Sequence, residues 1–292
     1  MRMGKGGVKT TLKRGLFLFI FLFQPYSLWA GENSLLLLPQ EPIFDHLIGD
    51  SREAQSSAVA QLKTMRFDGS IAATLEFLQW VPGDKTRWGW GVEGDTFIEL
   101  EWQPLSPDSL QTYNYFLDFP EKVSDWYLGT YLSESSGDFS NRVEYLHDNS
   151  HLGDGFFNTL QGAVYTRESF RYTASFRPSD QFRLYAGAGY YFHSVPDEPP
   201  FFLHLGTEIY TGSFPFVGGA LGRGYFTYDL KAKQEAGGVL NQNFAIGFQW
   251  RWKKDSRQSI RLGLLYYTGN NEYGQFYLQN DNHWSVGLFF DP

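Results

Sequence analysis

The chain has 292 residues, a formal net charge of −8, no cysteine and an aromatic content of 18%. The negative charge excludes a nucleic-acid partner, because binding to phosphates requires clustered Lys and Arg. The lack of cysteine excludes disulfides and thiolate metal sites, and we expect no metal and no cofactor.

The first 30 residues have the pattern of a secretory signal peptide. Five basic residues and no acidic one precede the apolar run "LFLFIFLF" (16–23), and "QPYSLWA" ends at the small residue Ala30. The apolar run is shorter than the roughly 20 residues of a membrane-spanning helix. We predict export and cleavage after Ala30, and losing these five basic residues changes the charge from −8 to about −13.

The segment after the leader lacks a strand pattern. "LLLLPQEPIFDHLIGDSREAQ" (35–55) is interrupted by prolines and shows no regular alternation. We predict that residues 31–55 form a periplasmic lead-in or a partial plug, and that residues 56–292 form one β-barrel.

Strands are predicted along the first half of this barrel. Alternation is present at 70–80, 93–103, 109–119 and 139–148, and is weaker at 54–65 and 125–133. Successive side chains of a strand point to opposite faces. In 139–148, Val143, Tyr145 and His147 therefore share an outward face, and Arg142, Glu144, Leu146 and Asp148 share an inward face.

The second half alternates more clearly. Strands are predicted at 165–177, 181–193, 201–212, 222–235, 240–253, 258–270 and 281–291. Aromatic and aliphatic residues occupy one face, as Phe244, Ile246 and Phe248 do. The other face is polar or small and includes Arg183, Gly187, Gly189 and His193.

These patterns predict an all-β fold, a transmembrane antiparallel β-barrel. Several runs reach membrane-spanning length, about 9–11 residues, whereas strands of soluble proteins average about five or six. Barrels of bacterial outer membranes have even strand numbers, and we predict twelve strands, with ten or fourteen as alternatives. A soluble β-protein is the other interpretation of the alternation.

The stretch "HDNSHLGD" (147–154) carries the densest group of reactive side chains. Outer-membrane lipid hydrolases place a His-x-Ser pair on an outward strand face, so that base and nucleophile meet. Here residue 149 is asparagine, and Ser150 points to the opposite face of a regular strand. The catalytic candidates are His147, Ser150 and Asp154. There are two alternatives to a catalytic site. One is a divalent-metal site formed by His147, Asp148, His151 and Asp154, and the other is a hydrogen-bonded entry into a loop. The motif comprises His147, Asn149, Ser150, His151, Leu152, Gly153 and Asp154.

Charged residues on the inward faces predict a charged lumen. Such a lumen either selects small solutes or is filled by salt bridges. The predicted lumen charges are Arg171, Arg177, Arg183, Arg251, Arg261, Glu76, Glu99, Glu144 and Glu208.

Three stretches resemble the signatures of domain-of-unknown-function family 1207: "LPQEPIFDHLIGDSREAQ" (38–55), "HDNSHLGDGF" (147–156) and "YGQFYL" (273–278). The middle motif of that family reads His-x-Ser-Ser-His-Leu-Gly-Asp followed by an acidic residue. This chain departs from it at Asn149 and Gly155. The resemblance implies an outer-membrane β-barrel without an established activity, and the missing serine weakens a catalytic role.

The sequence thus predicts a monomeric barrel exported to the bacterial outer membrane. Its expected partners are outer-membrane lipid, lipopolysaccharide and the barrel-assembly machinery. A structural or small-solute passage role is the first functional prediction. An outer-leaflet lipid hydrolase centred on His147 and a soluble periplasmic β-rich binding protein are the alternatives.

Overall fold

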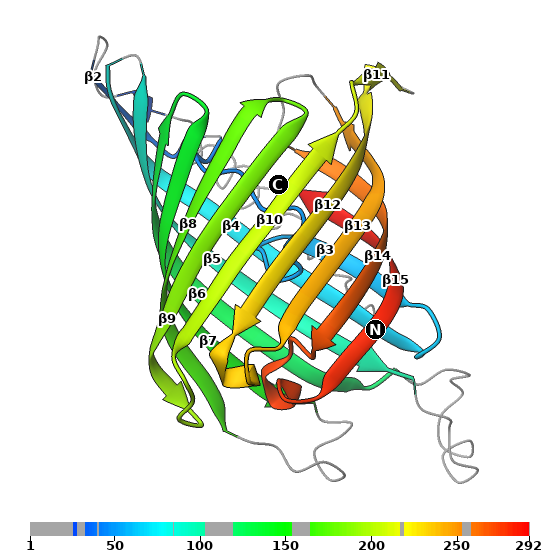
Figure 1. The fold of residues 1–292 in the computed structure, drawn as a ribbon. Coiled ribbons are helices and arrows are strands. Elements are labelled where there is room, and N and C mark those ends of the chain that lie inside the picture. The colour runs from blue at the N-terminus through cyan, green and yellow to red at the C-terminus, as the bar shows by residue number, and fades with distance from the viewer. Residues whose placement is uncertain are drawn as a thin grey trace, which may run out of the picture.

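The computed structural model describes residues 26–27, 33–39, 41–83, 85–102, 119–153, 164–216, 219–252 and 258–291. Twelve strands form a closed antiparallel barrel, because β15 pairs with β3 (Figure 1). This confirms the predicted fold and strand number. The barrel strands are β3 (Ser56–Gln61), β4 (Arg66–Pro82), β5 (Thr86–Glu101), β6 (Glu121–Ser136), β7 (Phe139–Leu152), β8 (Tyr165–Ser179), β9 (Phe182–Val195), β10 (Phe201–Tyr210), β12 (Leu221–Lys233), β13 (Leu240–Arg251), β14 (Ser259–Asn270) and β15 (Asn280–Asp291).

Short elements supplement the barrel. Strand β2 (Asn33–Leu37) pairs with the last residues of β4 and with β1 (Tyr26–Ser27), and β11 (Phe214–Pro215) pairs with β12. Two 3-10 helices, η3 (Gln234–Ala236) and η4 (Gly274–Phe276), lie in loops. Among the described residues, no helix has the length and apolar character needed to cross a membrane.

The predicted strands correspond to observed ones. All seven of the second half are present, and the weak patterns at 54–65 and 125–133 correspond to β3 and β6. The predicted strand at 109–119 lies outside the described residues, apart from its last residue. Within the predicted leader only Tyr26–Ser27 is described, so its cleavage remains a prediction.

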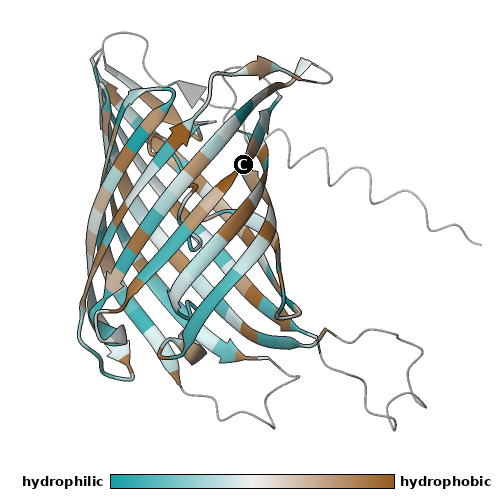
Figure 2. Cartoon of the chain, turned by 45° about the vertical axis from the view of Figure 1, so that its right-hand side comes forward, coloured by the Kyte–Doolittle hydropathy of each residue, from teal (hydrophilic) through white to brown (hydrophobic). Residues whose placement is uncertain are grey.

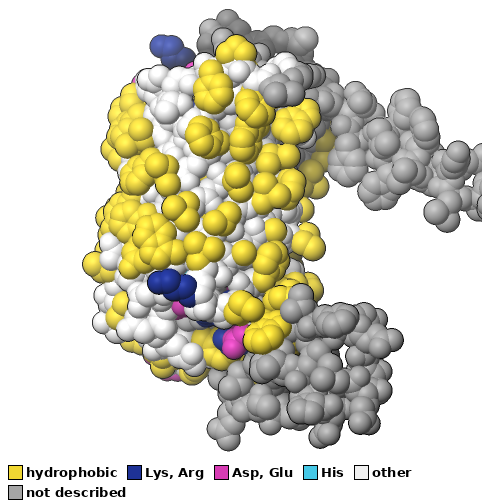
Figure 3. Space-filling model, turned by 90° about the vertical axis from the view of Figure 1, so that its right-hand side faces the viewer, with side chains coloured by type: hydrophobic (Ala, Val, Ile, Leu, Met, Phe, Trp, Pro, Cys, Tyr) yellow, Lys and Arg dark blue, Asp and Glu magenta, His cyan; other side chains and the backbone are white. Residues whose placement is uncertain are grey.

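The outer surface of the barrel is apolar. Hydrophobic and hydrophilic residues alternate along the strands (Figure 2), and hydrophobic side chains cover the face in Figure 3 with charged groups toward its ends. Ile71 and Leu128 are 76% and 65% exposed, whereas Arg167 and Glu208 are fully buried. A surface of this size and character requires lipid rather than water around it.

The two ends of the barrel differ in their connections. Hairpins β6–β7 and β8–β9 turn within residues 136–139 and 179–182, and the interval 210–221 is the exception at this end. The opposite end carries the two longest intervals, 101–121 and 152–165, together with 233–240 and 270–280. We call this opposite end the long-loop end. Outer-membrane barrels place longer loops outside the cell, so this end is expected to be extracellular.

The lumen contains part of the chain itself. Residues 41–55, the lumen segment, connect β2 to β3 and run through the barrel interior (Figure 1). Ile43, Phe44 and Leu47 of this segment are buried, and Phe44 and Leu47 pack against Tyr185 of β9.

Candidate functional site: a lumen filled by residues 41–55

The first half of the lumen segment binds basic residues of β8 and β9. Arg183 donates to the carbonyl oxygens of Asp45 and His46, both at 2.8 Å. Arg177 forms an ion pair of 3.1 Å with Asp45. The Ile48 amide donates to Glu208 of β10 at 3.0 Å. These bonds satisfy backbone groups that have no sheet partner, which a buried irregular segment requires.

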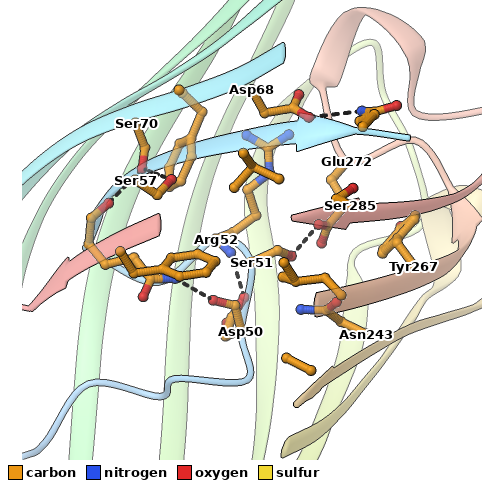
Figure 4. Close-up of a pocket in the computed structure, with 18 of the residues that line it drawn as sticks. Asp50, Ser51, Arg52, Ser57, Asp68, Ser70, Asn243, Tyr267, Glu272 and Ser285 are labelled. Carbon is orange, nitrogen blue, oxygen red and sulfur yellow. Dashed lines mark hydrogen bonds between the residues drawn. The ribbon is translucent and has the colours of Figure 1, made fainter. Parts of the chain in front are cut away.

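The bend of the segment, Asp50–Arg52, contacts the long-loop end (Figure 4). Asp50 accepts from Lys231 of β12, and Ser51 donates to Glu272 in the loop before β15. The Arg52 guanidinium lies 4.7 Å from the Phe97 ring and 4.1 Å from the Tyr273 ring. It also forms a 3.6 Å ion pair with Asp125 of β6.

The last part of the segment is held by two further arginines. Both terminal nitrogens of Arg142 bond to Glu53, at 2.8 and 3.0 Å, in the bidentate geometry that favours Arg–carboxylate pairs. Arg261 donates to Gln55 and pairs with Asp291 at 2.9 Å. The segment therefore binds walls on several sides of the lumen.

Charge keeps the acids of the segment ionised. Burial is the largest single influence and would raise the pKa of Glu53, but Arg142 and His46 together outweigh it and hold the pKa well below its ordinary value. Burial also acts to raise the pKa of Asp50, and the charges of Lys231 and His204 lower it overall. Both carboxylates thus depend on their basic partners.

The inner wall is electrostatically divided. We call β4–β7 the acidic side and β8–β14 the basic side. Among the described residues, Arg142 is the single buried basic residue of the acidic side. The buried acids of the basic side are Glu208, Asp229 and Glu235, the last of which lies in η3 between β12 and β13. The buried acids of the acidic side are Glu76, Glu93, Asp95, Glu99, Asp125, Glu144 and Asp148; the buried bases of the basic side are Arg167, Arg183, His204, Arg223, Lys231 and Arg261.

The lumen segment matches this division. Its arginine, Arg52, pairs with Asp125 on the acidic side, whereas Asp45 and Asp50 pair with bases on the basic side. Glu53 is the exception, because it pairs with Arg142 on the acidic side. The segment therefore binds the walls by charge complementarity as well as by packing.

A cavity of about 110 Å³ lined by both polar and apolar residues lies beside the bend (Figure 4). Its lining includes Ser57, Asp68, Asn243, Glu272 and Ser285. A cavity of this size has room for several water molecules, because one water occupies roughly 10–15 Å³ by this measure. It is too small for an open water-filled channel.

The three sequence motifs meet at the long-loop end. Ser150 accepts from the Gln275 amide at 3.0 Å, and Asp125 accepts from the Gly274 amide at 3.2 Å while it pairs with Arg52. A Cβ atom on Gly274 would lie 2.7 Å from the Ser150 Cβ, which is why glycine is required there. This junction anchors η4 above the lumen segment.

The catalytic candidates are not brought together. Ser150 is buried and faces the lumen, whereas His147 lies on the outer face with Asn149. Asn149 Nδ2 is 2.7 Å from His147 Nε2, and His147 Nδ1 is 3.6 Å from Glu168. Asp154 lies outside the described residues. Because Asn149 is no nucleophile, the outer face holds a base without a nucleophile beside it.

Two groups of side chains have the residue types of a metal site. His147 and Asp148 point to opposite faces of β7, so they do not form the predicted alternative site. In the lumen, ligand atoms of Asp50, His204 and Asp229 lie within 4.8 Å of one another. Lys231 already bonds to Asp50, and Asp229 accepts from Tyr185 at 2.6 Å, so a cationic group fills this place.

The nine predicted lumen charges lie on the inner wall, and six of them are buried. The side chains of Arg171, Arg177 and Arg251 are partly exposed and line smaller cavities. The prediction did not include several charged residues that the structure places there. These are Glu93, Asp95, Asp125, Arg167, Arg223, Asp229 and Lys231; the alternation in "GVEGDTFIEL" (91–100) was the available signal for the first two.

Solved structures of outer-membrane barrels are similar to this fold. Outer membrane phospholipase A from Escherichia coli matches with a TM-score of 0.48 at 11% identity, covering 87% of this chain and 94% of that chain. The Salmonella typhi phospholipase dimer with bound calcium gives 0.49 at 13%, with coverages of 87% and 94%. KdgM porin gives 0.41 at 8%, with coverages of 82% and 98%.

No curated protein sequence matches the chain. The family model described as protein of unknown function (DUF1207) matches residues 29–291, which agrees with the resemblance noted from the three motifs. The chain belongs to this family.

Proposed function

We propose that the protein is a bacterial outer-membrane barrel that forms a gated passage for small polar solutes, with residues 41–55 as the gate. The observation that carries this proposal is the binding of the lumen segment to walls on both the acidic and the basic side. A polar inner wall suits aqueous solutes. The segment that fills it keeps the passage closed at rest.

The way in which the segment is held supports movement. It is attached to the sheet through β2 and β3, but residues 41–55 themselves bind the walls through side chains rather than through a strand ladder. Releasing the segment therefore requires breaking these side-chain contacts and leaves the hydrogen-bonded ladder of the barrel strands intact.

The experiment is a conductance measurement with the segment locked in place. A Cβ atom on Gly49 would lie 3.2 Å from the Cβ of Thr227 on β12, close to the separation of about 3.5–4.5 Å found in disulfides. The chain has no cysteine of its own. Gly49→Cys/Thr227→Cys therefore forms a reversible lock, and each single substitution is its control.

In planar bilayers we expect brief openings of the reduced double variant and none after oxidation. Reduction with dithiothreitol should restore the openings. Equal conductance in both states would show that solutes do not pass the lumen segment. Absence of openings in every state, including variants that weaken the segment, would leave a structural role in place of passage.

A further inference from the structure

The outward part of the 147–154 motif forms a polar site on the lipid-facing surface. We call His147, Asn149 and Glu168 the lipid-facing trio. The Asn149 amide donates to His147 Nε2 at 2.7 Å, which leaves the ring proton on Nδ1, facing Glu168 at 3.6 Å. Ionisable side chains on a lipid-facing surface cost free energy and mark functional sites.

The trio lies at one end of an apolar groove. Gly94, Leu128, His147 and Glu168 are consecutive partners across β5–β8. The groove has a volume of about 440 Å³ and is bounded by Ile71, Trp126 and Leu128. A Cβ atom on Gly94 would meet no atom closer than 3.9 Å, so the missing side chain opens the groove.

The chemistry of the trio defines its ligand. Within the described part of the chain, the side-chain oxygen of Asn149 and the second carboxylate oxygen of Glu168 have no hydrogen-bond partner. Both atoms are acceptors. A ligand must therefore donate a proton at the level of its hydrocarbon chain. An acyl chain with a hydroxyl group does so, whereas the acyl chains of an ordinary phospholipid carry no donor.

We propose that the lipid-facing trio and its groove bind a hydroxylated acyl chain of lipid A, the lipid part of lipopolysaccharide, without hydrolysing it. The chain lies between Trp126 and Leu128, and its hydroxyl donates to the side-chain oxygen of Asn149, which lines the groove. The trio is near the long-loop end, which is expected to face the outer leaflet, where lipopolysaccharide resides. This site does not depend on the proposed passage.

The test compares lipid A with phosphatidylethanolamine by native mass spectrometry of the full chain in detergent. Asn149→Leu removes the member of the trio that accepts the hydroxyl and leaves His147 and Glu168 in place, and Gly94→Leu fills the groove. Tyr172→Phe is the matched control, because its hydroxyl makes another bond on this surface, 2.8 Å to Asn141. Heat-modifiable migration on gels verifies that each variant is folded.

We expect lipid A affinity to fall about tenfold in both Leu variants, the effect of one lost hydrogen bond or of lost chain contact. Tyr172→Phe should stay within about twofold of the wild type, and phosphatidylethanolamine should bind weakly to all. Unchanged lipid A affinity in folded Asn149→Leu would overturn the proposal. Equal binding of both lipids by the wild type would also overturn it, because the hydroxyl would then play no part.

Discussion

Replacing Arg52 by alanine removes the contact that holds the bend of the lumen segment to the acidic side. The guanidinium stacks on two rings, Phe97 and Tyr273, and each cation–π contact is worth about 0.5–2 kcal/mol. Asp125 also loses an ion-pair partner at 3.6 Å. We therefore expect Arg52→Ala to lower the free energy that holds the segment in the lumen by about 3 kcal/mol. This loss shifts the equilibrium between the bound and the released segment by about 100-fold.

The assay for Arg52→Ala is the open probability of single channels in planar bilayers at pH 7. We expect an increase of about two orders of magnitude over the wild type. Arg87→Ala is the control, because Arg87 lies on β5 as Phe97 does but is exposed. An unchanged open probability in folded Arg52→Ala would refute the reasoning, since the segment would then be held by contacts that do not involve this arginine.

Three further predictions concern acid, the motif junction and a crowded glycine. Basic partners lower the pKa values of Asp50 and Glu53 against the effect of burial. The two carboxylates therefore stabilise the closed segment above their unfolded pKa values of about 4, and this stabilisation is lost as the pH falls below those values. Wild-type conductance should rise below about pH 4, and a flat pH profile would contradict this. Ser150→Ala removes the hydroxyl that accepts from the Gln275 amide, which should cost about 1 kcal/mol and speed amide exchange at 271–279 about fivefold, whereas exchange at the wild-type rate would argue against this anchor. Gly274→Ala places a Cβ 2.5 Å from the Tyr165 ring and should destabilise the junction by about 1–3 kcal/mol in thermal unfolding; an unaltered midpoint would be inconsistent with the packing described.

The barrel wall was predictable because each strand repeats a simple physical pattern. Alternation reports which side chains face lipid and which face the lumen, and it requires no knowledge of distant parts of the chain. The inward orientation of Arg142 and Glu144 and the outward orientation of His147 follow from it directly. The same parity places Ser150 and His147 on opposite faces of β7.

Irregular features were not predictable in this way. The pairing of β8 with β9 shifts in register between Glu168 and Ser169, and His193 pairs with Glu168. The regular alternation predicted an inward side chain for His193, but this residue is exposed. The lumen segment has no period, and its bonds join residues far apart in sequence, such as Ile48 and Glu208. Only the folded barrel determines which wall each of its side chains reaches.

The opposed acidic and basic sides have a consequence for any solute that replaces the lumen segment. Charges of opposite sign on facing walls produce an electric field directed across the bore rather than along it, and low-dielectric walls strengthen it. Such a field turns a passing molecule so that its positive end points to β4–β7 and its negative end to β8–β14. An opened barrel would therefore favour zwitterions over simple ions of either sign, as the arrangement of Arg52, Asp45 and Asp50 in the resting protein already illustrates.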